Sequence, residues 1–319
     1  MDKDLPLVTI GIPTYNRANS FFRESLACAV SQNYPNLEIV VSDNCSDDGT
    51  KDLVRSCIDQ RIKYFKQKQK ISVQENFNFC LEQASGQYFL LLHDDDLIDR
   101  DFVTSCIEAA AGKQEIGVVR TGIRIIDNQG KILHEEKSNA QGLSPLEFFL
   151  AWFGYIKKRV PIYCCNTLFN ARRLKEIGGF HSRTNLYLDV AAIAKLVVRY
   201  GHVDISEIKA SYRKQYGRTT YGKKAMIADW CTDSHYLLDV ICDSINNNTS
   251  ILRSNGMKYM SKTCYTRTGR IESMPERIRT YIMVYRNFGY CYSPFRHFYY
   301  RIGKRIERDL KPFRHIRKA

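Results

Sequence analysis

The 319-residue sequence lacks the segments and motifs that mark several large classes of protein. It has no run of roughly 18 apolar residues, the length that a membrane-spanning helix requires. No GxGxxG follows the first strand-like run, no GxxxxGK is followed by serine or threonine, and no GxSxG occurs. These absences argue against a dinucleotide-dependent oxidoreductase, a P-loop NTPase and an α/β-hydrolase.

Targeting and disulfide signals are missing as well. Residues 1–4 lead directly into a strand-like run with no basic segment and apolar segment before it, which argues against a signal peptide. The 11 cysteines are odd in number and scattered, and none has the CxxC or Cys/His spacing of a zinc site. We therefore expect reduced thiols in a cytoplasmic protein, most of them filling the core.

Positive charge is abundant but confined to one end of the chain. The formal net charge is +14, and residues 251–319 hold 17 Lys and Arg against 4 Asp and Glu. The preceding 250 residues hold 31 and 30, so the body of the protein is nearly neutral. This distribution argues against nucleic acid as the substrate of the main domain and favours an anionic surface that meets the basic end.

Hydrophobic patterning predicts alternating strands and helices in the first half of the chain. An alternation of this kind is typical of a mostly parallel sheet with helices on both faces. Residues from about 222 onward have a helical pattern, so we expect a boundary near 215–222, with domains at 1–217 and 218–319. The expected strands are 7–12, 37–42, 62–65, 88–92, 118–126, 131–133 and 163–170, and the expected helices are 17–31, 50–59, 72–84, 172–178 and 188–200.

Turn and cap residues sharpen several of these boundaries. Ser72 with Glu75 and Ser144 with Glu147 have the spacing of capping boxes, the second with proline at the first helical position. Asp127–Gly130 separates two strand-like runs and predicts a hairpin. Glycine is expected to end the helices at residues 86, 178 and 201.

Three acidic positions lie where a sheet of this kind binds ligands, beyond the carboxyl ends of its strands. The first is the triplet Asp94–Asp96 after a buried strand. Side chains two apart on an extended segment share a face, so Asp94 and Asp96 are expected to converge on Mg²⁺ or Mn²⁺. The alternative is a solvated acidic turn.

The other two positions have two readings each. Asp43 ends the second strand and suits a ribose or base contact, whereas Asp47 and Asp48 of the same loop favour capping the helix that begins near Thr50. Asp189 opens an apolar helix, where it either stabilises the helix dipole or serves as a general base.

Taken in order, these motifs resemble the family-2 inverting glycosyltransferases over residues 5–215. The matching segments are VTIGIPTYNR at 8–17, the loop 43–50, the approach from Asn76 to the triplet, and GGF at 178–180 with Asp189 nine residues later. The resemblance implies an α/β GT-A fold, with a Rossmann-like, mostly parallel sheet flanked by helices and a C-terminal helical extension.

The resemblance also implies a reaction and roles for individual residues. One sugar is transferred from a nucleotide-diphosphate sugar to a glycan hydroxyl, with Asp189 as base and Mn²⁺ or Mg²⁺ on Asp94 and Asp96. Arg213 and Arg218 follow the last strand and either clamp the diphosphate or coat the surface. The implied nucleotide-sugar contacts are Pro13, Thr14, Tyr15, Asn16, Arg17, Asp43, Asn76, Asp94, Asp95, Arg213 and Arg218.

The sequence departs from the family pattern at three places. His93 stands where many relatives have aspartate, and Leu188 precedes Asp189 where many have glutamate. The QxxRW motif of processive synthases is absent, since Trp230 follows Ala228 and Asp229. This absence favours addition of a single sugar over polymerisation.

The resemblance implies a role in cell-envelope biosynthesis, such as O-antigen or capsule assembly on a lipid-linked acceptor. Residues 295–308 place aromatic residues and isoleucines among basic residues, which suits a helix lying on an anionic membrane at the inner leaflet. The alternative is a tail that packs on the catalytic domain.

Two other functions stay open. A sugar-nucleotide pyrophosphorylase would need a glycine-rich loop after the first strand, where this chain has GIPTY with one glycine. A nucleic-acid-binding protein would use the basic end, with strongly salt-dependent affinity. A non-catalytic scaffold is disfavoured by the intact carboxylates.

Overall fold

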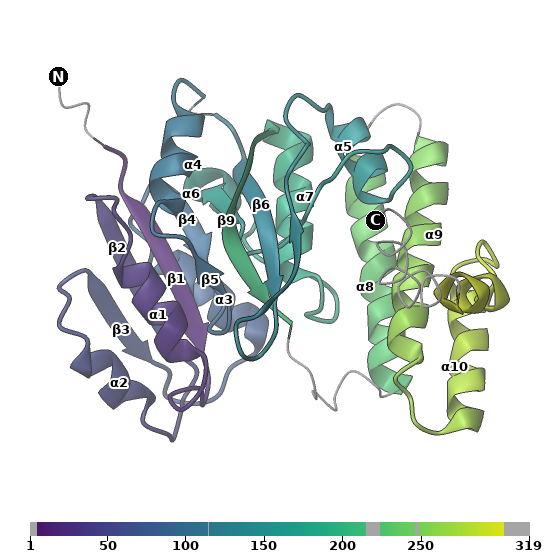
Figure 1. Ribbon diagram of the computed structural model, residues 1–319, viewed down its shortest axis with the longest axis horizontal. Coiled ribbons are helices and arrows are strands. Elements are labelled where there is room, and N and C mark those ends of the chain that lie inside the picture. The colour runs from purple at the N-terminus through teal and green to yellow at the C-terminus, as the bar shows by residue number, and fades with distance from the viewer. Residues whose placement is uncertain (1–4, 114, 215–223, 246–248, 303–319) are drawn as a thin grey trace, which may run out of the picture.

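A nine-stranded mixed sheet forms the body of the protein (Figure 1). The computed structural model describes residues 5–113, 115–214, 224–245 and 249–302. The sheet order is β3-β2-β1-β4-β8-β6-β9-β5, with β7 paired to β6. The strands are β1 (Val8–Thr14), β2 (Leu37–Asp43), β3 (Ile62–Lys66), β4 (Tyr88–Leu91), β5 (Leu97–Ile98), β6 (Val118–Ile126), β7 (Ile132–Glu136), β8 (Thr167–Asn170) and β9 (His202–Arg213).

The predicted fold class is confirmed. Strands β1 to β4 run parallel, β8 runs antiparallel to β4 and β6, and β6 and β9 are again parallel. All seven residues of β1 and of β2 are buried, as expected of β-branched runs covered on both faces. One core lies under α1 (Phe22–Val30), α2 (Thr50–Ser56) and α4 (Phe102–Ala110), and the other lies under α3 (Val73–Glu82), α5 (Pro145–Trp152), α6 (Ala171–Glu176) and α7 (Leu188–Tyr200).

Most local signals are confirmed. Both capping boxes form, the hairpin joins β6 to β7, and α7 spans the predicted residues and ends at Gly201, whose φ is +75°. Beyond α6, Gly178 has a φ of +84°, the left-handed conformation that glycine adopts without strain.

Several boundaries were wrong for identifiable reasons. Residues 18–21 form a turn, so α1 begins at Phe22 and not at residue 17. Strand β8 begins at Thr167 and not at residue 163. Gly86 does not end α3; a Cβ there would lie 2.7 Å from the Thr9 backbone nitrogen, so glycine permits a close strand approach. Segments β5 and α4 had no prediction.

The C-terminal part is helical, as predicted. Helices α8 (Lys224–Asp243), α9 (Thr249–Thr268) and α10 (Met274–Asn287) stand beside the sheet, with α8 against α7 and α9 against α5 (Figure 1). Their buried residues join the same apolar cluster as α5 and α7. The predicted domain boundary at 217/218 lies outside the described residues. Within the described ranges, no helix is both long enough and apolar enough to cross a bilayer.

Candidate functional site

The predicted acidic residues gather at one edge of the sheet. In the parallel register of β1 and β2, Thr14 lies opposite Asp43, so the two strands end side by side. Strand β4 pairs with β1 on its other side and leads into His93–Asp96. The loops that follow these strands therefore share the edge where open α/β sheets bind ligands.

Hydrogen bonds fasten the first two loops to each other. The Asn16 backbone N–H donates to Ser46 Oγ at 2.9 Å, and Asp47 N–H donates to Asn16 Oδ1 at 3.0 Å. Asp48 Oδ2 accepts from the Ala18 N–H at 2.9 Å. Asn16 has a φ of 51°, a left-handed conformation that asparagine tolerates. Asp48 also accepts from the backbone N–H and the hydroxyl of Thr50, although the N-cap residue of α2 is Gly49 and not Asp47 or Asp48.

Asp43 is fully buried at the end of β2. Its Oδ1 accepts from the Ser46 N–H at 2.8 Å, and its Oδ2 accepts from the Tyr64 hydroxyl at 2.5 Å. Burial and the Asp43 charge raise the pKa of Tyr64, which therefore remains a donor. Each carboxylate oxygen keeps a second lone pair, so Asp43 can accept one more bond at the strand end.

The remaining nucleotide-sugar candidates near β1 divide into exposed and buried positions. Tyr15 is 39% exposed, with the Lys70 ammonium 4.1 Å from its ring centroid. Pro13 and Thr14 are buried at the strand end. Asn76 is buried as well. Its amide oxygen accepts from the Ser42 hydroxyl and its amide nitrogen donates to the Ser42 carbonyl, so the side chain supports β2.

The acidic triplet lies on a turn, which changes the predicted pairing. Asp96 N–H donates to the His93 carbonyl at 3.1 Å, and this closes a four-residue turn after β4. One side-chain ligand atom each from His93, Asp95 and Asp96 lie within 4.8 Å of one another. Asp94 instead accepts from Thr14 Oγ1 at 2.9 Å. The segment is therefore a turn and not the extended run from which the pairing of Asp94 with Asp96 was predicted, and that pairing stays a prediction.

The electrostatics of the turn suit a cation. Burial, and next the charge of Asp95, raise the pKa of Asp94 to about 6 and that of Asp96 to about 7. The positive charge of Arg17 opposes this rise in the pKa of Asp94. Nε2 of His93 is buried and has no hydrogen-bond partner among the described residues, while the ring stacks on Phe77. The two carboxylates are ligands of the kind that Mn²⁺ and Mg²⁺ prefer, whereas an imidazole nitrogen suits a transition metal better than Mg²⁺.

Arg213 lies behind the turn and not on the surface. It is 2% exposed, its N–H donates to Asp96 Oδ1 at 2.9 Å and its Nε donates to the Asp95 carbonyl at 2.9 Å. Its Nη2 donates to Glu24 at 2.6 Å. The surface alternative for Arg213 is therefore wrong, and the side chain holds the turn in place. Arg218 lies outside the described residues.

Asp189 lies in the first turn of α7 and is half-buried. The segment before it is anchored by Asn78, which bonds both the N–H and the carbonyl of Phe180. The thiol of Cys164 has its pKa raised by burial and then by both Asp189 and Asp96.

Sequence reasoning missed Asp233, which holds the start of α7. This residue of α8 is fully buried, and its carboxylate accepts from the backbone N–H groups of Thr184, Leu186 and Tyr187. Nothing in the local pattern of α8 marks it, since its partners lie more than 45 positions earlier. The C-terminal helices thus take part in placing Asp189.

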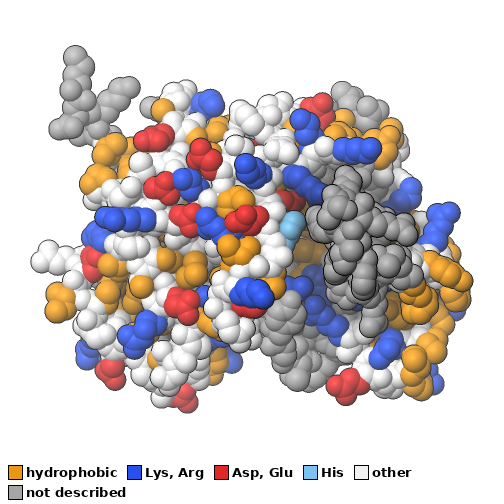
Figure 2. Space-filling view, viewed as in Figure 1, with side chains coloured by type: hydrophobic (Ala, Val, Ile, Leu, Met, Phe, Trp, Pro, Cys, Tyr) orange, Lys and Arg blue, Asp and Glu red, His pale blue; other side chains and the backbone are white. Residues whose placement is uncertain are grey.

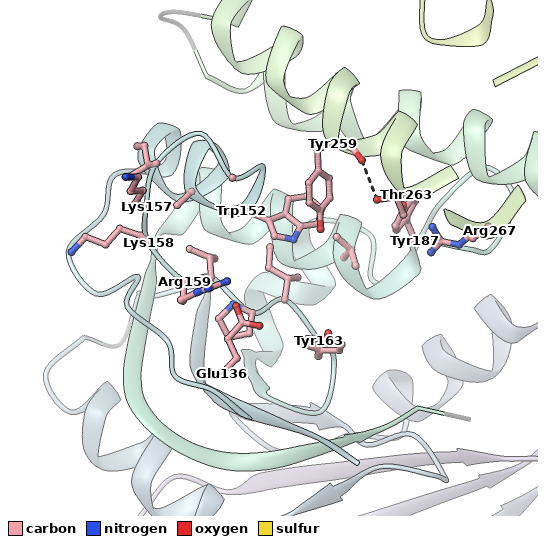
Figure 3. Close-up of a pocket in the computed structure, with 17 residues that line it drawn as sticks. Glu136, Trp152, Lys157, Lys158, Arg159, Tyr163, Tyr187, Tyr259, Thr263 and Arg267 are labelled. Atoms are coloured by element: carbon pink, nitrogen blue, oxygen red, sulfur yellow. Dashed lines mark hydrogen bonds between the residues drawn. The ribbon is translucent and has the colours of Figure 1, made fainter. Parts of the chain in front are cut away.

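Two adjoining cavities open beside these carboxylates. One, of about 790 Å³, is lined by Asp95, Arg213, Trp230 and Arg267. The other, of about 670 Å³, is lined by Tyr187 and Val190, the near neighbours of Asp189. Tyr163, Thr263 and Arg267 line both cavities. Figure 3 shows the second cavity, with Trp152 and Tyr259 over it, Glu136 and Tyr163 below and Arg267 at one end.

Comparison with known proteins gives one matching family. The family model Glycosyl transferase family 2 matches residues 9–178. A Campylobacter jejuni GalNAc(5)-diNAcBac-PP-undecaprenol beta-1,3-glucosyltransferase is 26% identical over 231 residues, which cover 67% of this chain and 72% of that protein. The matches to other curated relatives, most of them uncharacterized glycosyltransferases, cover 19% to 54% of those proteins' lengths.

Solved structures share the fold. S. aureus TarS 1-349 in complex with UDP-GlcNAc gives a TM-score of 0.59 at 14% identity, and covers 93% of this chain and 92% of that one. The mannosyltransferase PcManGT from Pyrobaculum calidifontis in complex with GDP-Man and Mn²⁺ gives 0.56 at 18%, and covers 88% and 75%. At these identities the likeness shows the fold alone.

Proposed function

The chain belongs to glycosyl transferase family 2, and from this membership we propose that it transfers one sugar from a nucleotide-diphosphate sugar to a glycan hydroxyl with inversion. The observation that carries the proposal is the pair of adjoining cavities, one lined by Asp95 of the acidic turn and the other by Tyr187 and Val190 next to Asp189 in the chain. The two cavities share Tyr163, Thr263 and Arg267. The carboxylates of the turn suit a cation, and the carboxylate of Asp189 lies in the first turn of α7.

The donor lies across the ends of β1 and β2. Asp43 accepts from the nucleoside, Tyr15 and Arg17 flank it, and Asp94 reaches the ribose from the turn. TarS and PcManGT were solved with UDP-GlcNAc and GDP-Man, which supports a donor of this class. The exposed ring of Tyr15 offers a face on which a nucleobase can stack.

A divalent ion would be held by His93, Asp95 and Asp96, and would supply Lewis-acid neutralisation of the diphosphate. Arg213 keeps these ligands in place through its bonds to the backbone and side chain of the turn. Ser25 adds a third anchor, since its hydroxyl donates to the Asp96 carbonyl at 2.8 Å.

Asp189 takes the proton of the acceptor hydroxyl. The hydroxyl oxygen forms its bond to the anomeric carbon as the bond from that carbon to the diphosphate oxygen breaks. A single displacement of this kind inverts the anomeric configuration, as in inverting hydrolysis with an acceptor hydroxyl in place of water. The nucleoside diphosphate leaves with the electron pair.

Donor turnover tests this proposal directly. With Mn²⁺ present, the purified protein is expected to use at least one sugar nucleotide from a panel of UDP- and GDP-sugars. It should either hydrolyse that donor slowly or transfer its sugar to an acceptor. The same sugar nucleotide should raise the melting temperature, because a ligand that binds only the folded state stabilises it. Absence of both effects across the panel would refute the assignment.

The C-terminal surface supports a second part of the proposal, contact with an anionic membrane on its cytoplasmic face. Apolar side chains gather with Lys and Arg at the edge of the molecule formed by the last helices (Figure 2). Phe295, Phe298 and Tyr299 are 77%, 64% and 73% exposed. Aromatic residues among cations suit the headgroup region, and a lipid-linked acceptor would be presented there. Residues 303–319, the end of the predicted tail, lie outside the described residues.

Replacing Phe295 and Phe298 together by serine is expected to weaken binding to vesicles with anionic lipid by at least about tenfold, since full burial of each phenylalanine contributes about 1.5–3 kcal/mol and about 1.4 kcal/mol is tenfold. Cosedimentation with phosphatidylglycerol vesicles measures the change. The matched control replaces Tyr155 by serine, an aromatic residue 59% exposed in the loop after α5. Equal binding by both variants and by the wild type would contradict membrane docking.

A further inference from the structure

The cavity beside Asp95 has the lining of an anion site. Its ionisable residues are Arg213, Lys214, Arg267, Arg270, His134 and a single carboxylate, Asp95. Glu24 offsets the charge of Arg213, which faces the acidic turn. Lys214 directly follows β9, Arg267 lies in the last turn of α9 and Arg270 lies just after it, so two distant parts of the chain meet there.

Arg267 is held in a defined position at this cavity. Its guanidinium carbon lies 3.6 Å from the centroid of the Trp230 ring, and Trp230 is in turn packed edge-on against Tyr187 at 4.8 Å. Stacking fixes the plane of the guanidinium and leaves its N–H edge to bind an oxygen anion. No carboxylate within the described ranges forms an ion pair with Arg267.

A second donor at the same place has no partner. Trp230 is 7% exposed, and its Nε1–H is buried without a hydrogen-bond acceptor in the described part of the chain. An indole N–H can only donate, and leaving a buried donor unpaired is costly. A cationic lining, a stacked arginine and an orphaned donor together call for an oxygen-rich anion.

We propose that Arg267 and Trp230 form a phosphate-binding subsite, by which the C-terminal helices bind a diphosphate group next to the acidic turn. The inference rests on the proposed function and deepens it, because the sugar donor and a lipid-linked acceptor of that reaction each carry a diphosphate group. The diphosphate of the donor is one source, and the diphosphate of a lipid-linked acceptor is the other. Arg267 lines both cavities and so lies within reach of either.

Calorimetric titration of the full chain with Mg²⁺ present tests the subsite. The titrants are UDP, GDP, the matching monophosphates and inorganic pyrophosphate. The variants are Arg267→Ala, Arg267→Lys, which keeps the charge, and Trp230→Phe, which keeps the ring and removes the N–H. Arg279→Ala, an exposed arginine of α10 outside both cavities, is the matched control.

We expect Arg267→Ala to weaken diphosphate binding by about 10- to 100-fold, the range for a lost charge-assisted hydrogen bond, and Trp230→Phe by less. If Arg267→Ala weakens binding of a nucleoside diphosphate and leaves binding of the monophosphate unchanged, the bound diphosphate is that of the donor. If Arg267→Ala weakens only the binding of pyrophosphate to protein already saturated with nucleotide, the bound diphosphate is that of the acceptor. Arg267→Lys should recover part of the affinity in either case.

The proposal is overturned if Arg267→Ala binds every titrant as Arg279→Ala does, or if the wild type binds neither pyrophosphate nor a nucleoside diphosphate. Failure of the proposed function is a separate result. A protein that turns over no sugar nucleotide but still loses pyrophosphate binding on Arg267→Ala keeps the subsite and not the reaction.

Discussion

Asp189→Asn is expected to lower the turnover number for sugar transfer by about 10²–10⁴-fold, the range that a positioned general base contributes. The amide cannot take the proton of the acceptor hydroxyl, whereas its shape matches the carboxylate that it replaces. Asp189 lies half-buried in the first turn of α7. Steady-state rates with saturating donor and acceptor measure the effect.

The structure supplies a matched control for this variant. Asp233→Asn also exchanges one carboxylate for an amide in the same region, but Asp233 accepts three backbone bonds from the segment before Asp189. We expect this variant to lose about 1–3 kcal/mol of unfolding free energy, since a buried amide cannot satisfy the same three donors. Asp189→Asn should unfold at the wild-type temperature and bind nucleotide normally. Substantial turnover by well-folded Asp189→Asn would exclude the residue as base.

The sequence predicted well what depends on neighbouring residues. Buried strands, capping boxes and the glycine that ends α7 are signals within a few positions, and the structure has each of them. The order of the motifs was enough to predict the family, because the motifs lie in widely separated segments of the chain and their combination is specific. The parallel topology also predicted that the carboxyl ends of β1, β2 and β4 lie at the same edge of the sheet.

What the sequence could not predict depends on contacts between distant segments. The triplet was read as a continuation of β4, but a single bond from Asp96 N–H to the His93 carbonyl makes it a turn. Arg213 was read as reaching toward ligand or solvent, whereas Glu24, 189 positions earlier, holds it in the interior. Asp233 and Arg267 carry no local motif, and their importance appears only when α8 packs against α7 and α9 packs against α8.

Asp95→Asn and Asp96→Asn are each expected to weaken the apparent affinity for Mn²⁺ by at least about 100-fold and to slow transfer accordingly. This exceeds the 10- to 100-fold effect typical of residues that only support a metal ligand. Asp96→Asn keeps an oxygen that can accept from the Arg213 N–H, so the turn should stay intact. Rates measured across a Mn²⁺ titration, with chelator as the zero point, give the affinities.

Asp94→Asn in the same turn decides between the two groupings of carboxylates. The structure joins His93, Asp95 and Asp96 within 4.8 Å and turns Asp94 toward Thr14. Asp94→Asn should therefore raise the KM for donor while leaving the Mn²⁺ dependence close to that of the wild type. If Asp94→Asn instead loses metal and Asp95→Asn retains it, the pairing of Asp94 with Asp96 is correct and the turn rearranges when the ion binds. The comparison uses three variants within three consecutive positions, so differences in local folding are small beside a 100-fold change in affinity.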